Sequence, residues 1–297
     1  MIIRSGNKLT GNHGYDNRRA ATVLTTPFIH FSGGENNGEA TGDRFTNYGN
    51  IGESTFEYAG RLSLTARNGF QANAPWLIGE QAGAFYSTCL YFPTEPSDVD
   101  QMMNISNEGA MLFFGRVKIT DNAYEEGIWG AGNMLAGGPT DVTQYLKFTG
   151  NGANDLSYSY RAQNGSAKTV TVMATGGLPK GGAEHRILLL VDRVNLQVIC
   201  MVNEANITTV TGLDPYVSTS MVTPTMGISI GDESVGTTAG ARASTGLNYL
   251  GGDYRDFSFF NVTNNVDKVV TNFQAIADAF GSAPEGFIPD TLKDLIE

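Results

Sequence analysis

The stretch Ala183–Ile207, AEHRILLLVDRVNLQVICMVNEANI, decides the fold of this chain. Two apolar runs, Ile187–Val191 and Leu196–Val202, flank a short polar turn at Asp192–Asn195. Branched aliphatic residues are typical of strands, and two such runs joined by a short polar turn indicate a β-hairpin. The stretch therefore predicts a long hairpin in the interior of a sheet sandwich.

The chain as far as residue 262 repeats this strand pattern. Apolar and polar residues alternate in short runs, with turns about every 8–12 residues, which favours a sandwich or a barrel. Asn164-Gly165 separates two of these runs, and Asn-Gly is a strong hairpin signal because both turn positions need a positive φ. Besides the hairpin strands, we expect strands at Pro27–Phe31, Phe56–Ala66, Ala84–Phe92, Met111–Thr120, Gly127–Gly132, Gln144–Phe148, Asp155–Ala162, Thr169–Met173, Met226–Gly231 and Tyr254–Val262.

Both ends of the chain depart from this pattern. Residues 1–24 are polar and without periodicity, which indicates an N-terminal arm or a disordered leader. After residue 262 apolar residues recur at helical spacing as far as Phe280, and Gly281 follows, which predicts one amphipathic helix. A second short helix is expected from Asp290. We expect these helices to cover an edge of the sandwich, the alternative being a partner protein. The predicted division is an arm over 1–24, a sandwich over 25–262 and a helical segment over 263–297.

The central hairpin resembles that of laminin-G-like domains of the concanavalin A type. In those domains a histidine precedes a strand that ends in Val-Asp-Arg, as His185 precedes Val191-Asp192-Arg193 here. The segment Arg255–Thr263, RDFSFFNVT, is similar to the strand that closes their sheet and leads into a short helix. The chain departs from the pattern at Met201–Glu204, where their Asp-Gly turn is replaced. The resemblance implies an all-β, concanavalin A-like jelly-roll β-sandwich with an N-terminal arm and a C-terminal helix.

Charge and hydropathy exclude some classes of partner. The net charge of −11 disfavours nonspecific binding to nucleic acid, and Arg18-Arg19 is the only adjacent basic pair. No window approaches the 18 or so apolar residues of a membrane-spanning helix, so we expect no membrane insertion. The N-terminus lacks the apolar core of a secretory signal. We therefore expect a protein that is made in a cytoplasm and has no signal peptide.

Motifs for catalysis are weak. A retaining glycoside hydrolase needs two carboxylates about 5–5.5 Å apart, and on a strand these come from alternate positions. Glu125 and Glu126 are adjacent and would point to opposite faces. Gly227–Gly231 spells G-x-S-x-G, but it lies in a strand-like run without a following helix. The sequence therefore predicts a protein that is not an enzyme, with a divergent polysaccharide hydrolase as an alternative.

Two groups of residues are candidates for ligand binding. Trp129, Tyr124, Asn122 and Asn133 surround one predicted strand, and an aromatic ring with amide groups suits a sugar. The alternative is that Trp129 belongs to the core, with Gly127 and Gly130 making room for it. The second group is Asp98 and Asp100, whose carboxylates are a possible calcium site; the alternative is a solvated loop. Laminin-G-like domains often hold calcium near the sandwich rim. We expect no other cofactor.

The leading hypothesis for function is a non-enzymatic structural protein of a tailed-bacteriophage virion. It would be a capsid decoration, fibre or tail-tip subunit with a lectin-like domain that binds surface glycans. The low charge, the many Gly, Asn and Thr residues and the missing export signal favour this. The expected partners are other virion proteins and further copies of the chain, and the expected location is the virion. The alternatives are a carbohydrate-binding adhesin outside a virion and the divergent hydrolase.

Overall fold

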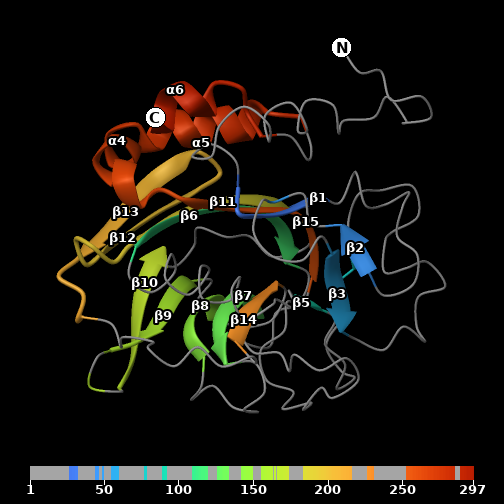
Figure 1. The fold of residues 1–297 in the computed structure, drawn as a ribbon, viewed down its shortest axis with the longest axis horizontal. Helices are drawn as coiled ribbons and strands as arrows, with labels where there is room; N and C mark the ends of the chain where they lie inside the picture. Colours follow the sequence, from blue (N-terminus) through green and yellow to red (C-terminus); the bar gives the residue numbers. More distant parts are fainter. Residues whose placement is uncertain are drawn as a thin grey trace.

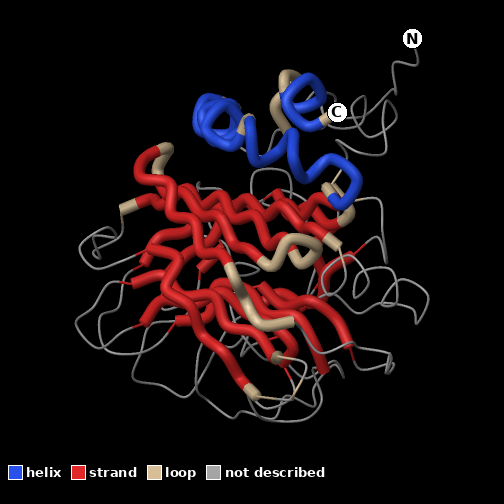
Figure 2. The backbone as a smooth tube through the Cα atoms, turned by 90° about the vertical axis from the view of Figure 1, so that its left-hand side faces the viewer, coloured by secondary structure: helices blue, strands red, loops and turns tan. Residues whose placement is uncertain are grey.

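In the computed structural model two antiparallel sheets lie face to face, and helices cover the outer side of one of them (Figures 1 and 2). The N-terminal arm predicted for residues 1–24 lies outside the described residues. The structure describes residues 27–32, 44–46, 49, 55–59, 77–78, 89–91, 109–119, 126–133, 142–149, 155–162, 164, 166–173, 183–215, 226–230, 252–284 and 288–297.

The seven-stranded sheet has the order β1-β15-β6-β11-β12-β13, and β4 also pairs with β15. Its members are β1 (Ile29–Ser32), β4 (Leu77–Ile78), β6 (Ala110–Ile119), β11 (Glu184–Asp192), β12 (Gln197–Val202), β13 (Ala205–Thr211) and β15 (Gly252–Asn261). The eight-stranded sheet has the order β10-β9-β8-β7-β14-β5-β3-β2. Its members are β2 (Arg44–Thr46), β3 (Thr55–Ala59), β5 (Cys89–Tyr91), β7 (Glu126–Asn133), β8 (Val142–Thr149), β9 (Asp155–Arg161), β10 (Ala167–Met173) and β14 (Met226–Ile230).

The two predicted hairpins are confirmed. β11 pairs with β12 from Ile187↔Val202 to Asp192↔Gln197, and β9 pairs with β10 on either side of Asn164. A third hairpin, from β12 to β13, was not predicted. Its turn is Asn203-Glu204, with φ values of 53° and 55°, which is the positive-φ geometry of a two-residue hairpin turn. Asn203-Glu204 thus replaces the expected Asp-Gly turn.

The central strands of the seven-stranded sheet, β6, β11 and β12, are buried on both faces, which explains their continuous apolar runs. In β11, Ile187 and Leu189 point into the core between the sheets, whereas Leu188 and Leu190 point outward into a second core beneath the helices. The same alternation holds in β6 and β12. A strand that is covered on one face alternates apolar with polar residues, but a strand that is covered on both has no polar side.

The helical segment differs from the prediction in two ways. The predicted single helix is interrupted, because Asn272 (φ −99°, ψ 12°) separates α4 (Val266–Thr271) from α5 (Phe273–Ser282), after a 3-10 turn at Thr263–Asn265. The Asn272 side chain donates instead to the Leu295 carbonyl of α6 (Leu292–Ile296), at 2.9 Å.

The position of the helices is the second difference. They pack on the outer face of the seven-stranded sheet rather than on an edge, since the second core joins helical side chains to central strands. None of the helices in the described ranges has the length and apolar character needed to cross a membrane.

Candidate functional site

The outer face of the eight-stranded sheet carries a row of polar and aromatic residues in register. Across four neighbouring strands, Thr169 of β10 pairs with Ser159 of β9, Ser159 with Tyr145 of β8, and Tyr145 with Gly130 of β7. At about 4.8 Å between strands, this row is roughly 14 Å long. The same register continues through Ser229 of β14 to β5, β3 and β2.

A second row runs parallel to the first. Here Thr171 pairs with Ser157, Ser157 with Lys147, and Lys147 with Gly127. We call the two rows on β8–β10 the hydroxyl face, which consists of Tyr145, Lys147, Ser157, Ser159, Thr169 and Thr171.

The sequence places these residues outward by simple alternation. In β9, Leu156, Tyr158 and Tyr160 belong to the core, so Ser157 and Ser159 point to the opposite side. In β8, Leu146 is a core residue and lies between Tyr145 and Lys147. The hydroxyl face is therefore the polar half of strands whose other half builds the sandwich.

The hydroxyl face is partly accessible. Thr169 and Thr171 are exposed and Tyr145 is half-buried, whereas Lys147, Ser157 and Ser159 are buried. The Ser159 and Thr169 hydroxyl oxygens are 2.8 Å apart and share a hydrogen bond. The Lys147 ammonium lies 5.2 Å from the centre of the Tyr145 ring, within the range of a cation–π contact. The face thus offers the exposed threonines and part of the Tyr145 ring, with the serines and the Lys147 cation buried beneath them.

The structure contradicts a sugar-binding role for Trp129. Its ring is 0% exposed and packs against Phe113 at 5.8 Å, Phe259 at 5.6 Å and Tyr158 at 6.5 Å between ring centres. Trp129 is opposite Leu146, another inward residue, after a register shift that follows Gly127. A buried ring has no free face for a sugar, so the alternative of a core residue holds.

Of the other predicted site residues, only Asn133 lies within the described part of the chain. Asn133 ends β7, where its backbone is in register with Met226 of β14. Tyr124, Asn122, Asp98 and Asp100 lie outside the described residues. The described residues contain no group of three or more His, Cys, Asp or Glu side chains that could hold a metal ion.

The sequence prediction centred on β7 and did not include the hydroxyl face on β8–β10. The available signal was the alternation of hydroxyl with large side chains in DLSYSYR (Asp155–Arg161) and of Thr with Val in Lys168–Val172. It shows that these strands have a hydroxyl side, but their pairing with Tyr145 requires the sheet register.

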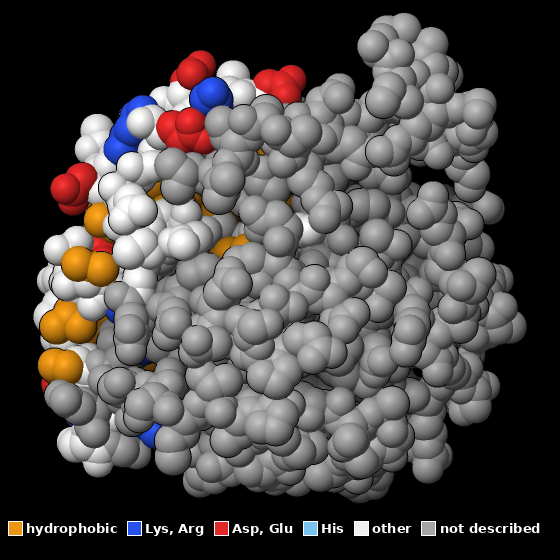
Figure 3. All heavy atoms as spheres, in the orientation of Figure 1, with side chains coloured by type: hydrophobic (Ala, Val, Ile, Leu, Met, Phe, Trp, Pro, Cys, Tyr) orange, Lys and Arg blue, Asp and Glu red, His pale blue; other side chains and the backbone are white. Residues whose placement is uncertain are grey.

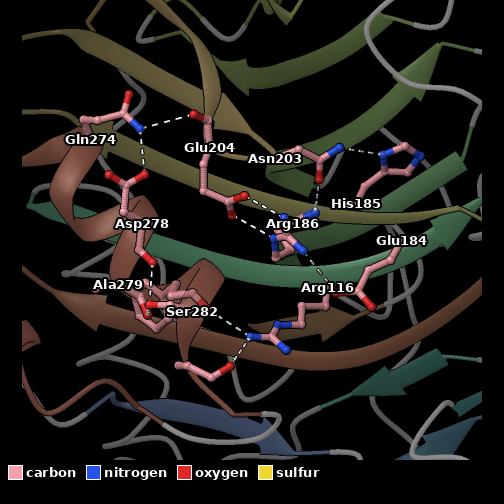
Figure 4. A network of polar contacts seen from close by, with 12 residues as sticks. Arg116, Glu184, His185, Arg186, Asn203, Glu204, Gln274, Asp278, Ala279 and Ser282 are labelled. Atoms are coloured by element: carbon pink, nitrogen blue, oxygen red, sulfur yellow. Dashed lines mark hydrogen bonds and ion pairs between the residues drawn. The ribbon is translucent and has the colours of Figure 1, made fainter.

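A separate polar network lies under α5 on the seven-stranded sheet (Figure 4). Arg116 donates to the carbonyls of Phe280 (2.9 Å) and Ala283 (3.1 Å), where α5 ends. Burial lowers the pKa of Arg116, while the nearby Asp256 carboxylate opposes that shift. Because a guanidinium at a helix C-terminus satisfies free carbonyls and complements the helix dipole, Arg116 anchors the helix.

The second anchor joins the β12–β13 turn to both the sheet and the helix. The Arg186 guanidinium donates to both Glu204 carboxylate oxygens, at 2.8 and 2.6 Å, and this contact raises the pKa of Arg186. Gln274 of α5 donates to the Glu204 carbonyl at 3.2 Å. A Cβ at Gly281 would lie 2.6 Å from Glu204 Oε1, so this glycine makes room for the carboxylate and does not end the helix. The network is a structural anchor.

One contact between a histidine and a serine could not be predicted from the sequence. His30 Nδ1 lies 2.7 Å from the Ser258 hydroxyl, although 228 positions separate the two residues. They are 2% and 1% exposed, so a substrate carbonyl has no access to the hydroxyl. The neighbouring Asp256 carboxylate is directed to Arg116 and Arg255, at 3.9 and 3.6 Å. We therefore interpret the pair as a buried hydrogen bond.

Comparisons with known proteins bear on the fold. No family model matches the sequence, and no curated protein does. A sialidase from Trypanosoma rangeli, solved with a difluoro-KDN ligand, is 15% identical with a TM-score of 0.51, over 91% of this chain and 38% of that chain. The CBM40 domain of the Ruminococcus gnavus IT-sialidase is 15% identical with a TM-score of 0.47, over 66% of this chain and 96% of that chain. Similarity at this identity concerns the fold alone, and the predicted concanavalin A-like β-sandwich is confirmed.

Proposed function

We propose that this chain is a non-enzymatic carbohydrate-binding protein and that a glycan lies across its hydroxyl face. The observation that carries the proposal is the row Thr169–Ser159–Tyr145–Gly130, which the sheet register aligns across four strands. A sugar ring has an apolar face that packs on an aromatic ring and a rim of hydroxyl groups that need hydrogen-bonding partners. Tyr145 supplies the ring, and Thr169 and Thr171 of β10, two strands away on one side of it, supply donors and acceptors.

The glycines of β7 leave the Tyr145 ring without a neighbouring side chain on that strand. Gly130 and Gly127 occupy the positions in register with Tyr145 and Lys147, where any other residue would add a side chain. Both glycines are themselves buried, and so is Lys147, which is 8% exposed and has its ammonium 5.2 Å from the centre of the Tyr145 ring. The groups left to contact a glycan are therefore the half-buried Tyr145 ring and the exposed threonines of β10.

The test compares Tyr145→Ala with the wild-type chain on an array of neutral and acidic oligosaccharides, followed by calorimetry with the strongest one. Loss of stacking on the ring is expected to weaken binding about tenfold, which corresponds to about 1.4 kcal/mol. Tyr145→Phe should retain most of the affinity. Ile207→Ala, on an exposed residue of the other sheet, is the matched control and should bind like the wild type.

Either of two results would overturn the proposal. One is an array that retains none of the oligosaccharides on the wild-type chain. The other is an affinity of Tyr145→Ala equal to that of the wild type. Recovery of the bound oligosaccharide unchanged after long incubation is expected for a binding protein, and shortened products would instead favour the polysaccharide hydrolase.

The location of this activity remains a prediction from the sequence. A subunit of a bacteriophage virion and an adhesin outside a virion would use the same face. The virion hypothesis also predicts that deletion of residues 1–24 abolishes incorporation into particles while the sandwich stays folded.

A further inference from the structure

We propose that the edge strand β13 pairs with β13 of a second copy of this chain, antiparallel and about a two-fold axis, so that the two seven-stranded sheets become one. β13 ends its sheet: among the described strands it pairs only with β12. The backbone groups on its other side have no partner strand there. An open edge of this kind is a ready template for another strand.

The sequence of β13 lacks the usual protection of an edge. Proteins guard such strands with charged residues, Pro, bulges or very short strands. ANITTVT (Ala205–Thr211) has no charge and no Pro. It has one bulge, where Asn206 (φ 55°) and Ile207 together lie opposite Met201 of β12. From Thr208 to Thr211 the pairing with β12 is regular.

The edge of the other sheet shows the contrast. β10 lies on the same side of the sandwich, and it carries Lys168, whose ammonium bonds to Asp214 at 2.8 Å. A charged side chain on an edge strand generally disfavours the addition of another strand. No equivalent charge is present on β13, in a molecule whose net charge is −11.

Exposed hydrophobic side chains gather at this edge. Figure 3 shows them along the left margin, where β12 and β13 lie in Figure 1. The two large ones of the described residues are Val194, 56% exposed, and Ile207, 48% exposed. Ile207 lies near the start of β13, and Val194 lies in the turn before Gln197, the residue that pairs with Thr211 at the end of β13. They therefore mark opposite ends of the strand.

The placement of these two exposed residues at opposite ends of β13 favours a second copy of the chain over an unrelated strand. In an antiparallel pair centred on Thr209, that residue meets its own counterpart and Thr208 is opposite Val210. Ile207 of one copy is then opposite Thr211 of the other. The exposed Val194 of that second copy lies in the turn next to its Thr211. A two-fold interface of this kind is self-complementary, as isologous interfaces require. Thr–Thr pairs across strands are favourable.

The first measurement is the solution mass of the wild-type chain by sedimentation over a range of concentrations. The expected result is a species of twice 31.8 kDa that dissociates on dilution. Thr209→Lys should be a monomer, because two lysines would be opposite each other. Thr209 is exposed, so the substituted monomer should keep the circular dichroism spectrum of the wild type. Ala275→Lys, at an exposed position of α5, is the control and should remain a dimer.

A charge-pairing experiment tests the register itself. Thr209→Asp should also be a monomer, and an equimolar mixture of Thr209→Lys and Thr209→Asp should restore the dimer. A wild-type chain that stays monomeric at all concentrations would overturn the inference, as would a dimer that survives Thr209→Lys. Glycan binding by Thr209→Lys should match that of the wild type, which keeps this inference separate from the proposed function.

Discussion

At the scale of single residues, Gly115 shows how closely the core is filled. It lies in β6 between two inward residues, Phe113 and Val117. A Cβ built on Gly115 would lie 2.6 Å from Cζ of Phe113 and 3.1 Å from Cδ1 of Phe257. Both are ring atoms of fully buried side chains, so neither ring has free space into which it can move.

Gly115→Ala is therefore expected to lower the free energy of unfolding by about 1–3 kcal/mol, the usual cost of overpacking a core. Urea denaturation followed by tryptophan fluorescence measures the change. Phe113→Leu removes the ring atom that the new methyl group would meet, so the double variant should lose less stability than the sum of the two single losses. Additive losses would show that the methyl group is accommodated elsewhere.

Trp129 shows why single residues were harder to predict than strands. Its strand was predicted, and the glycines on either side of it were noticed. The face to which the ring points depends on the register shift after Gly127, which moves Trp129 into line with the inward Leu146. A shift of one position exchanges the two faces of a strand, and a single sequence does not show where a bulge occurs.

At the scale of elements, the attachment of α5 depends on one buried guanidinium. Arg116 donates to two carbonyls at the end of the helix, and it also faces Asp256. Arg116→Met keeps the length of the side chain but leaves these groups without a donor. We expect a loss of about 2–4 kcal/mol in the free energy of unfolding, as for the removal of a buried charged partner.

Urea denaturation again measures this loss, and Gln274→Ala is the comparison. Gln274 is an exposed residue of the same helix and donates to the Glu204 carbonyl at the surface. Its removal should cost less than about 0.5 kcal/mol. Equal effects of the two variants would mean that Arg116 is not the anchor.

Most elements were recognisable from sequence, but outside the two predicted hairpins their partners were not. Apolar runs showed that β6, β11, β12 and β15 exist. β13 was missed, because five of its seven residues are Asn, Thr or Ala and its turn lacks glycine. The prediction of a single helix was wrong at Asn272. Apolar residues recur at helical spacing on both sides of Asn272, so the sequence gives no sign of the interruption. The Asn272 side chain binds α6, a contact between positions 23 residues apart.

At the scale of the whole molecule, the C-terminal segment completes a second core. Ile276, Phe280 and Ile296 are less than 2% exposed, and they cover Leu112, Leu190 and Ile199 of the sheet. A chain that ends after residue 262 would expose these strand residues as one apolar surface. We expect this truncated chain to aggregate and to bind a hydrophobic dye strongly.

The measurement compares dye fluorescence and the sedimentation of the truncated chain with those of the full chain. A second truncated chain, in which Leu112, Leu190 and Ile199 are all replaced by Thr, should be less aggregated. A truncated chain that remains monomeric and binds no dye would show that the segment is not needed as a cover.

The need for residues 263–297 as a cover for the sheet has a consequence for biosynthesis. Domains generally begin to fold from the N-terminal side while the ribosome is still adding residues, at about 5–20 per second. Every strand of the seven-stranded sheet precedes α4 in the chain, so the sheet can assemble before its cover has been made. For that interval the nascent protein presents Leu112, Leu190 and Ile199 to solvent. A pause in translation after residue 262 would lengthen this exposure, which makes the nascent chain a natural client for chaperones.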